Sequence, residues 1–250
     1  MAKIKHYYAE PTIAEFHADR SFVRGLRGPI GSGKSVGCCM EILAKAAGQQ
    51  PNAAGVRKSR WAVVRNTYGE LRSTTIKTWQ DWVPEEACPI VYDAPIRGTL
   101  KQRQPDGTTI ELEMLFMALD RPDHVRKLLS LELTSAWINE AREVPKAILD
   151  GLTGRVGRYP NISDGGATWS GIIMDTNPPD DDHWWYRLAE EETPQGWSFY
   201  SQPPALLRDS VGNYIPNPDA ENVKNHKLGY VYWLRQVPGK KEEWIKAYVL

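Results

Sequence analysis

Glycine, lysine and serine residues near the N-terminus have a spacing that suits the binding of phosphate groups. Gly28 is followed by four residues and then by Gly33, Lys34 and Ser35. Glycines let the backbone curl so that N–H groups point at phosphate oxygens, and the helix that follows presents its positive end to the same charge. Lys34 can reach the β- and γ-phosphates, and the Ser35 hydroxyl can ligate Mg²⁺. We therefore expect ATP and Mg²⁺ to bind at Gly28, Pro29, Ile30, Gly31, Ser32, Gly33, Lys34 and Ser35.

A second candidate element is an apolar run that ends in two polar residues. Ala136-Trp137-Ile138 is followed by Asn139 and Glu140, which is the shape of a Walker B segment. In the usual order an Asp holds the Mg²⁺ shell and a Glu orients the attacking water, so Glu140 is the best candidate for the general base. Asn139 stands where the Asp is expected, and its amide oxygen can accept from a metal-bound water without bringing negative charge. Either metal affinity is weaker here, or Asp175 compensates. The alternative interpretation is a simple turn at a strand end.

A third element, Thr176-Asn177-Pro178-Pro179, follows another apolar run. An amide at a strand end beside a nucleotide can sense the γ-phosphate and pass its loss to neighbouring segments, so Asn177 is a candidate coupling residue. The alternative is a proline-rich turn that uses the asparagine as a turn former.

An additional cation is often needed to stabilise the charge on a transferring phosphate. We expect at least one arginine to serve in this way, with Arg126 acting across a subunit interface or Arg27 acting within the chain as the preferred choices. Arg27 immediately precedes the glycine-rich loop, and Arg126 precedes the Walker B run. Each arginine taken alone also fits an ordinary solvated or ion-paired role. The full set of candidates is Arg27, Arg65, Arg126, Arg155 and Arg158.

Strand and helix signals alternate along the chain and must position these residues. Strands alternating with helices predict an α/β fold with a mainly parallel central sheet flanked by helices, in which ligands bind beyond the carboxyl ends of the strands. Pro105-Asp106-Gly107 predicts a hairpin between flanking strands. All three motifs fall at expected strand ends. We expect strands over 22–27, 61–64, 133–138 and 169–174, helices over 34–47, 68–83, 145–156 and 181–192, and a loop over 48–59.

The composition changes after about residue 203, where prolines and polar residues cluster. We expect a core over 1–202 and a small C-terminal lid or linker over 203–250, with a helix over 220–236.

The 250 residues carry 31 basic and 31 acidic side chains, and the resulting zero net charge argues against a protein that coats nucleic acid by bulk electrostatics. Three cysteines fit a reduced cytoplasmic protein. Neither a signal peptide nor an apolar run of the ~20 residues of a membrane span is visible, so we expect a soluble protein.

Taken together, these segments resemble the ATPase domain of phage large terminases, the motors that package DNA. The resemblance implies the fold of a P-loop NTPase of the ASCE type. The tail from Gly229 to Leu250 resembles the lid that leads to the nuclease domain in that family. The order and spacing of the segments are more specific than the phosphate loop alone. The residues that carry the resemblance are those of the loop 28–35, the run 61–65 leading into 68–73, Trp137-Ile138-Asn139-Glu140-Ala141 and Thr176-Asn177-Pro178.

The resemblance implies ATP-driven translocation of double-stranded DNA into a procapsid, in the host cytoplasm. It also implies a homo-oligomeric ring, commonly a pentamer, docked on a portal protein, with a small terminase subunit that selects the genome. A nuclease domain would follow residue 250, so we expect no DNA cleavage from this chain. Two alternatives stay open. One is another DNA-dependent P-loop ATPase, such as a helicase. The other is a nucleotide-gated assembly module with little turnover, which Asn139 favours.

Overall fold

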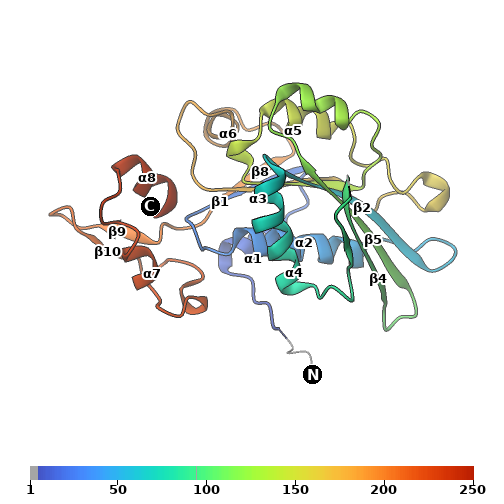
Figure 1. Ribbon diagram of the computed structural model, residues 1–250, viewed down its shortest axis with the longest axis horizontal. Coiled ribbons are helices and arrows are strands. Elements are labelled where there is room, and N and C mark those ends of the chain that lie inside the picture. The colour runs from blue at the N-terminus through green and yellow to red at the C-terminus, as the bar shows by residue number, and fades with distance from the viewer. Residues whose placement is uncertain (1–4, 94) are drawn as a thin grey trace.

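The structure, a computed structural model, describes residues 5–93 and 95–250. Its centre is an eight-stranded sheet in the order β3-β4-β5-β2-β6-β7-β1-β8 (Figure 1). The six strands from β5 to β8 run parallel to one another, and β4 and β3 extend one edge with antiparallel pairing. The strands are β1 (Val23–Arg27), β2 (Val56–Arg65), β3 (Ile90–Val91), β4 (Ile96–Arg103), β5 (Thr109–Ala118), β6 (Ser135–Asn139), β7 (Gly171–Thr176) and β8 (Trp197–Ser201).

Helices cover both faces of this sheet (Figure 1). On β2, Trp61 and Val63 point into one buried layer while Ala62 and Val64 point into the other, as the two-residue period of a strand requires. The first layer is closed by α1, α2 and α4, and the second by α5 and α6. The helices are α1 (Pro11–Ala18), α2 (Lys34–Gly48), α3 (Tyr68–Glu70), α4 (Lys77–Trp82), α5 (Lys146–Thr153) and α6 (Trp184–Tyr186), with π-helical turns at Leu71–Ile76 and Arg187–Glu191.

The predicted α/β class and the mainly parallel sheet are confirmed. The predicted loop over 48–59 is wrong at its end, because β2 begins at Val56 and pairs with β5 along its whole length. The helix predicted over 220–236 is also wrong for most of its length, since the chain there forms only a 3₁₀ turn at Val223–Asn225 and the short helix α7 (Val231–Leu234). Strand β8 and helix α1 were not predicted.

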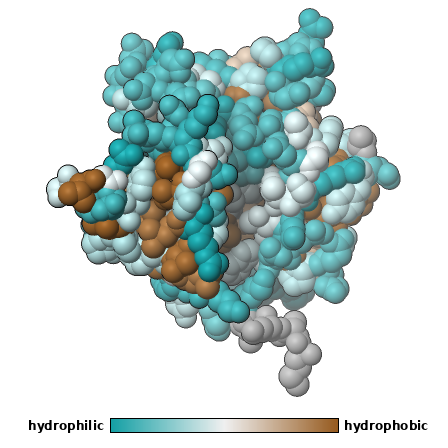
Figure 2. Space-filling model, turned by 60° about the vertical axis from the view of Figure 1, so that its left-hand side comes forward, coloured by the Kyte–Doolittle hydropathy of each residue, from teal (hydrophilic) through white to brown (hydrophobic). Residues whose placement is uncertain are grey.

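The C-terminal segment, residues 203–250, has a small apolar cluster of its own. It contains α7, α8 (Glu242–Tyr248) and the antiparallel pair β9 (Leu206–Arg208) and β10 (Tyr214–Pro216). Figure 1 places it beside the sheet, in orange and red. Figure 2 turns this end of the molecule forward and shows hydrophobic side chains gathered on its surface. The buried cluster is Ala205, Leu206, Trp233, Ile245 and Val249, and the exposed hydrophobic residues of the segment are Leu207, Val211, Ile215, Leu228 and Val231.

In the part of the chain that the structure describes, no helix is both long enough and apolar enough to cross a membrane.

A charged pair is buried under α1, between β1 and α2. Arg24 is 0% exposed, and its guanidinium donates to a Glu41 carboxylate oxygen at 2.6 Å. The other carboxylate oxygen of Glu41 lies 2.6 Å from Nδ1 of His17. Burial alone would raise the pKa of Glu41, but the hydrogen bond with His17 and the charge of Arg24 lower that pKa to about 2. The pair therefore contributes to folding only while Glu41 is ionised.

We expect Glu41→Gln to lower the free energy of unfolding at pH 7 by about 3 kcal/mol, because the Arg24 charge is then buried without a counter-charge. The pKa of Glu41 lies below its ordinary value of 4.5, so its contribution is fully present above that value and is lost as the pH falls towards about 2. The difference in free energy of unfolding between wild type and variant, measured by urea denaturation, should therefore become smaller from pH 7 to pH 3. The control Asp150→Asn, which breaks an exposed pair with Lys146, should change stability by less than about 0.5 kcal/mol. Equal stability of wild type and Glu41→Gln at pH 7 would contradict this account.

Candidate functional site

The three motifs meet at one edge of the sheet, where parallel strands end. Strand β7 lies between β1, which leads into the glycine-rich loop, and β6, which ends at Asn139. Arg27 at the end of β1 is the register partner of Thr176, and Asn139 is the register partner of Asp175. Parallel neighbours lie about 4.8 Å apart, so residues over a hundred positions apart in sequence become adjacent here. One strand thus separates the strand that leads into the glycine-rich loop from the strand that ends at Asn139.

The loop from Gly28 to Ser35 curls over the start of α2. Gly31 and Gly33 have φ angles of 76° and 91°, which side chains rarely allow. The ammonium of Lys34 donates to the carbonyl oxygens of Gly28 and Pro29, both at 2.8 Å. Burial lowers the pKa of Lys34, and the neighbouring carboxylates of Glu140 and Asp175 oppose that shift.

Asn177 and Glu140 connect this lysine to the second and third motifs. The Asn177 side-chain oxygen accepts from Lys34 at 3.1 Å. Its amide nitrogen donates to both carboxylate oxygens of Glu140, at 3.3 and 3.4 Å. Lys34, Glu140 and Asn177, which the sequence proposed separately, therefore form one chain of contacts.

Glu140 has an unusual backbone conformation. Its φ of 50° and ψ of 58° place it in the left-handed region, although it is not a glycine. Such a conformation costs on the order of 1 kcal/mol and persists where surrounding contacts hold it. Burial, followed by the negative charge of Asp175, raises the pKa of Glu140, while the charges of Lys34 and Arg65 lower it. A half-buried carboxylate with a raised pKa is a reasonable acceptor for a proton.

Asp175 and Asn139 lie next to Ser35. The Ser35 hydroxyl donates to Asp175 at 2.7 Å, and the amide nitrogen of Asn139 donates to both oxygens of Asp175 at 3.0 and 3.1 Å. The Asn139 oxygen accepts from the Thr75 hydroxyl at 2.6 Å. The amide must have this orientation, because only its NH₂ group can donate to a carboxylate. Asn139, predicted as a metal ligand, therefore turns its oxygen away from Ser35.

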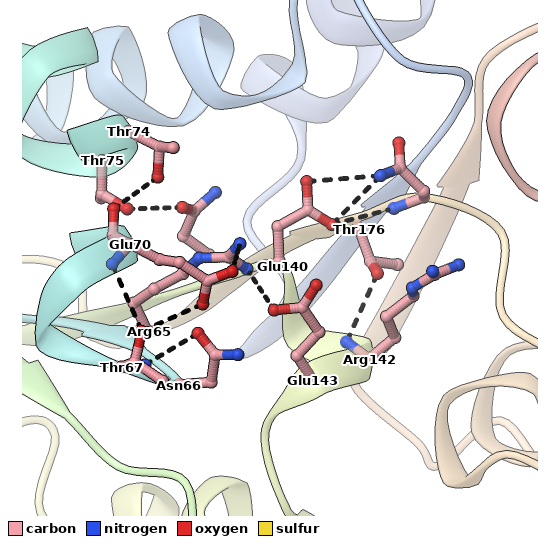
Figure 3. Close-up of polar contacts among 12 residues, drawn as sticks. Arg65, Asn66, Thr67, Glu70, Thr74, Thr75, Glu140, Arg142, Glu143 and Thr176 are labelled. Carbon is pink, nitrogen blue, oxygen red and sulfur yellow. Dashed lines mark hydrogen bonds and ion pairs between the residues drawn. The ribbon is translucent and has the colours of Figure 1, made fainter.

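Two arginines reach this site. Arg65, at the end of β2, is 6% exposed and pairs with Glu143 at 3.0 Å and with Glu70 at 3.7 Å (Figure 3). Arg142 was not among the predicted candidates. Its guanidinium donates to the carbonyl of Pro178 at 3.1 Å and to the hydroxyl of Tyr248 at 2.5 Å. Its position two residues after Glu140, on the same turn, is the one sequence signal that could have singled it out.

The other candidate arginines have partners elsewhere or lie on the surface. Arg27 donates to the Ser201 hydroxyl at 2.6 Å and pairs with Glu190 at 2.5 Å, on the side of β8. Arg155 donates to a backbone carbonyl of the preceding loop. Arg126 is exposed on a 3₁₀ turn that packs against α5, and Arg158 is exposed after that helix. Among the residues that the structure describes, none of these four guanidinium groups forms a hydrogen bond or ion pair with the phosphate loop of its own chain.

The C-terminal segment holds the phosphate loop by its backbone. The indole N–H of Trp233 donates to the Ile30 carbonyl at 2.7 Å. The Gly31 carbonyl accepts from the Asn222 amide at 2.7 Å and from Nε2 of His226 at 2.8 Å. The N–H groups of Gly28, Ile30 and Ser32 already donate to backbone carbonyls, that of Ile30 to Tyr248 in the C-terminal segment at 2.9 Å, so a bound anion would be contacted by the remaining N–H groups of the loop. Sequence reasoning did not find these contacts.

A hollow of about 260 Å³ borders Ser32, Gly33 and Val36. Its remaining walls combine the N-terminal segment, α4 and the C-terminal segment. Among the residues described, no group of three or more His, Cys, Asp or Glu side chains could by itself hold a metal ion. A metal at the loop would therefore need oxygen ligands from a bound nucleotide besides those of Ser35 and a carboxylate, which is the usual arrangement for Mg²⁺ with phosphates. The hydroxyl and carboxylate next to each other at the start of α2 fit such an ion.

Comparison with known proteins identifies the fold. No protein-family model matches the sequence, and no curated protein matches it in sequence. Among solved structures, the large terminase of a thermophilic bacteriophage aligns over 94% of this chain and 48% of its own, with a TM-score of 0.62 and 13% identity. The HK97 bacteriophage large terminase aligns over 98% and 50%, with a TM-score of 0.60 and 13% identity.

An isolated domain aligns over most of both chains. The ATPase domain of the Thermus phage P74-26 large terminase covers 97% of this chain and 93% of its own, with a TM-score of 0.54 and 13% identity. The large terminase of the thermophilic bacteriophage has also been solved in complex with ADP and with ATP-γ-S. This chain spans about half the length of that protein and of the HK97 protein, and it has the fold of large terminase ATPase domains.

We expect Trp233→Phe, which removes the N–H donor but keeps an aromatic ring, to destabilise the protein by about 1 kcal/mol, because the half-buried Ile30 carbonyl loses its partner. Amides of the loop from Ile30 to Ser32 should exchange faster in hydrogen–deuterium exchange followed by mass spectrometry. Trp184→Phe is the matched control, since the Trp184 indole also donates to a backbone carbonyl, that of Val144 at 3.1 Å, which is not part of the loop. Unchanged loop exchange in Trp233→Phe would show that this contact does not hold the loop.

Proposed function

We propose that this chain is the ATPase motor domain of a large terminase, which hydrolyses ATP to drive double-stranded viral DNA into a procapsid. The observation that carries the proposal is the chain of contacts from Lys34 through Asn177 to Glu140, at the sheet edge where the phosphate loop begins. The shared fold supports the same conclusion. A phosphate-binding loop, a carboxylate and a sensing amide within reach of one another are the parts that nucleoside triphosphate hydrolysis needs.

Each residue then has a defined task. The loop N–H groups and the Lys34 ammonium bind the β- and γ-phosphates, and Lys34 exchanges its contacts with the loop carbonyls for contacts with phosphate oxygens. The Ser35 hydroxyl and the neighbouring carboxylate would hold Mg²⁺, which would neutralise charge that develops on the phosphate oxygens. Glu140 orients the attacking water and accepts its proton, because its raised pKa brings it closer to the working pH.

Asn177 and Arg142 connect the site to the moving parts of the protein. Asn177 bridges Lys34 and Glu140, so loss of the γ-phosphate changes its hydrogen bonds directly. Arg142 follows Glu140 by two residues and contacts Tyr248 in α8, so it relays this change to the C-terminal segment. Coupling of this kind generally depends on a segment that can adopt two arrangements, and the presence of a phosphate group favours one of them.

The hollow beside Ser32 and Gly33 is the proposed site of the adenine base. Tyr7, Tyr8 and Trp82 contribute aromatic surface to its walls, and aromatic rings stack on nucleobases without regard to sequence. The base would then lie between the N-terminal and C-terminal segments. Both would be ordered further by nucleotide binding.

The proposed partners follow from the function of a packaging motor. They are double-stranded DNA, further copies of this chain in a ring, here proposed as a pentamer, a portal protein and a small terminase subunit, all in the host cytoplasm. The proposed core is residues 1–202, and the proposed lid is residues 203–250. Cleavage of DNA is not proposed for this chain. One competing function is another DNA-dependent P-loop ATPase, such as a helicase. The other is a nucleotide-gated module with little turnover, which Asn139 favours.

We expect Glu140→Gln to lower ATP turnover by about 10²–10⁴-fold while ATP still binds, because the water loses its base and the phosphate loop is unchanged. Turnover is measured as Mg²⁺-dependent phosphate release with double-stranded DNA present, and binding is measured by calorimetry with ATP-γ-S. Glu191→Gln, at an exposed position that ends the π-helical turn after α6, is the control and should match wild type. Full turnover in Glu140→Gln would refute the base assignment, and ATP binding without turnover in wild type would favour the nucleotide-gated module.

Mixing inactive variants separates an arginine that acts on a neighbouring subunit from one that acts within the chain. An Arg126→Ala subunit keeps its own Glu140, and a Glu140→Gln subunit can still supply Arg126, so we expect the mixture to regain turnover that neither variant has alone. Arg142→Ala mixed with Glu140→Gln should stay inactive, because Arg142 contacts Pro178 and Tyr248 of its own chain beside its own Glu140. Wild-type turnover should also rise more steeply than linearly with protein concentration. Full activity of Arg126→Ala alone would exclude Arg126 from this role.

A further inference from the structure

The position that normally supplies the acid of the magnesium shell has an amide that points the wrong way. Asn139 ends β6, directly before Glu140, yet its NH₂ group faces Ser35 and Asp175, at 3.2 Å from the Ser35 hydroxyl. Its oxygen is occupied by the Thr75 hydroxyl. An NH₂ group cannot ligate a cation or accept from metal-bound water. The site therefore lacks an oxygen ligand at the end of β6.

A carboxylate lies one strand away at the same level. Asp175 is the register partner of Asn139 on β7, and it is 0% exposed. Its oxygen Oδ2 accepts from the Ser35 hydroxyl at 2.7 Å, and its oxygen Oδ1 accepts from the Trp137 indole at 2.8 Å. Ser35 is the residue whose hydroxyl would ligate the metal in a phosphate loop of this type. The negative charge missing from β6 is thus present on the strand between β6 and the loop strand.

We propose that Asp175 supplies the carboxylate of the magnesium shell and that Asn139 is a positioning residue that holds it. This inference rests on the proposed function and names a residue for the metal in that site. Asn139 and Trp137 bind Asp175 from β6 through three N–H···O contacts, at 2.8, 3.0 and 3.1 Å. The carboxylate is therefore fixed in place without the side chain of β6 contacting the metal itself.

The exchange of acid and amide between neighbouring strands keeps the chemistry of the shell. Mg²⁺ prefers carboxylate, hydroxyl and water oxygens, and it commonly binds protein through one carboxylate, often by way of its water ligands. A carboxylate beside the Ser35 hydroxyl can supply such an oxygen whether it belongs to β7 or to β6. The exchange also places the metal-binding acid on β7 and not on β6, the strand that Glu140 follows, so Glu140 is left to act on water.

The test compares metal affinity with nucleotide affinity in the full 250-residue chain. Mn²⁺ binding to the ADP complex is followed by the loss of the free Mn²⁺ electron paramagnetic resonance signal, and ADP binding in EDTA is followed by calorimetry. We expect Asp175→Asn to bind ADP in EDTA as wild type does, and to bind Mn²⁺ at least tenfold more weakly in the ADP complex. Unchanged Mn²⁺ affinity in a folded Asp175→Asn protein would overturn the inference.

The exchanged double variant, Asn139→Asp with Asp175→Asn, provides a second measurement if the single variant does not fold. It keeps one carboxylate among the same partners, so we expect Mn²⁺ affinity within about threefold of wild type. A larger rise would mean that wild type has no carboxylate in the metal shell, and that Asp175 serves only to hold Trp137 and Ser35. Failure of wild type to bind ADP at all, with or without metal, would instead refute the proposed function.

Discussion

A carboxylate with no access to water must be surrounded by hydrogen-bond donors, and the site is arranged around this requirement at Asp175. The donors come from the first turn of α2 and from β6, so the start of the phosphate loop helix is tied to two strands at once. This tie sets the height of Ser35 above the sheet edge. Lys34, one residue earlier, is thereby directed back over the loop and towards Asn177.

Much of this arrangement could be predicted from the sequence because its signals are local. The glycine spacing, the apolar runs of β6 and β7 and the polar residues that end them each occupy fewer than ten consecutive residues. Parallel strands then bring their ends together by geometry, so Lys34, Glu140 and Asn177 could be expected near one another.

The rest depends on contacts between distant parts of the chain, which leave no periodic signal. The orientation of the Asn139 amide depends on Thr75, and the position of Arg142 depends on Tyr248. The segment 220–236 has residues suited to a helix, but Asn222, His226 and Trp233 instead bind the loop and the chain stays irregular there. Strand β8 was missed because its short run, 197–201, is only half-buried and lacks a strong alternation.

The contacts of Trp233, Asn222 and His226 with the backbone of Ile30 and Gly31 also bear on how such proteins can recombine. Recombination near residue 203 would join the phosphate loop of one parent protein to the C-terminal segment of another. The carbonyls of Ile30 and Gly31 would then lose the hydrogen-bond donors that are positioned for them. Every parent has the same main-chain carbonyls, so the mismatch would come from the position of the C-terminal segment and not from the amino-acid sequence of the loop. The phosphate loop and the C-terminal segment that holds it should therefore be inherited together, although about two hundred residues separate them in the sequence.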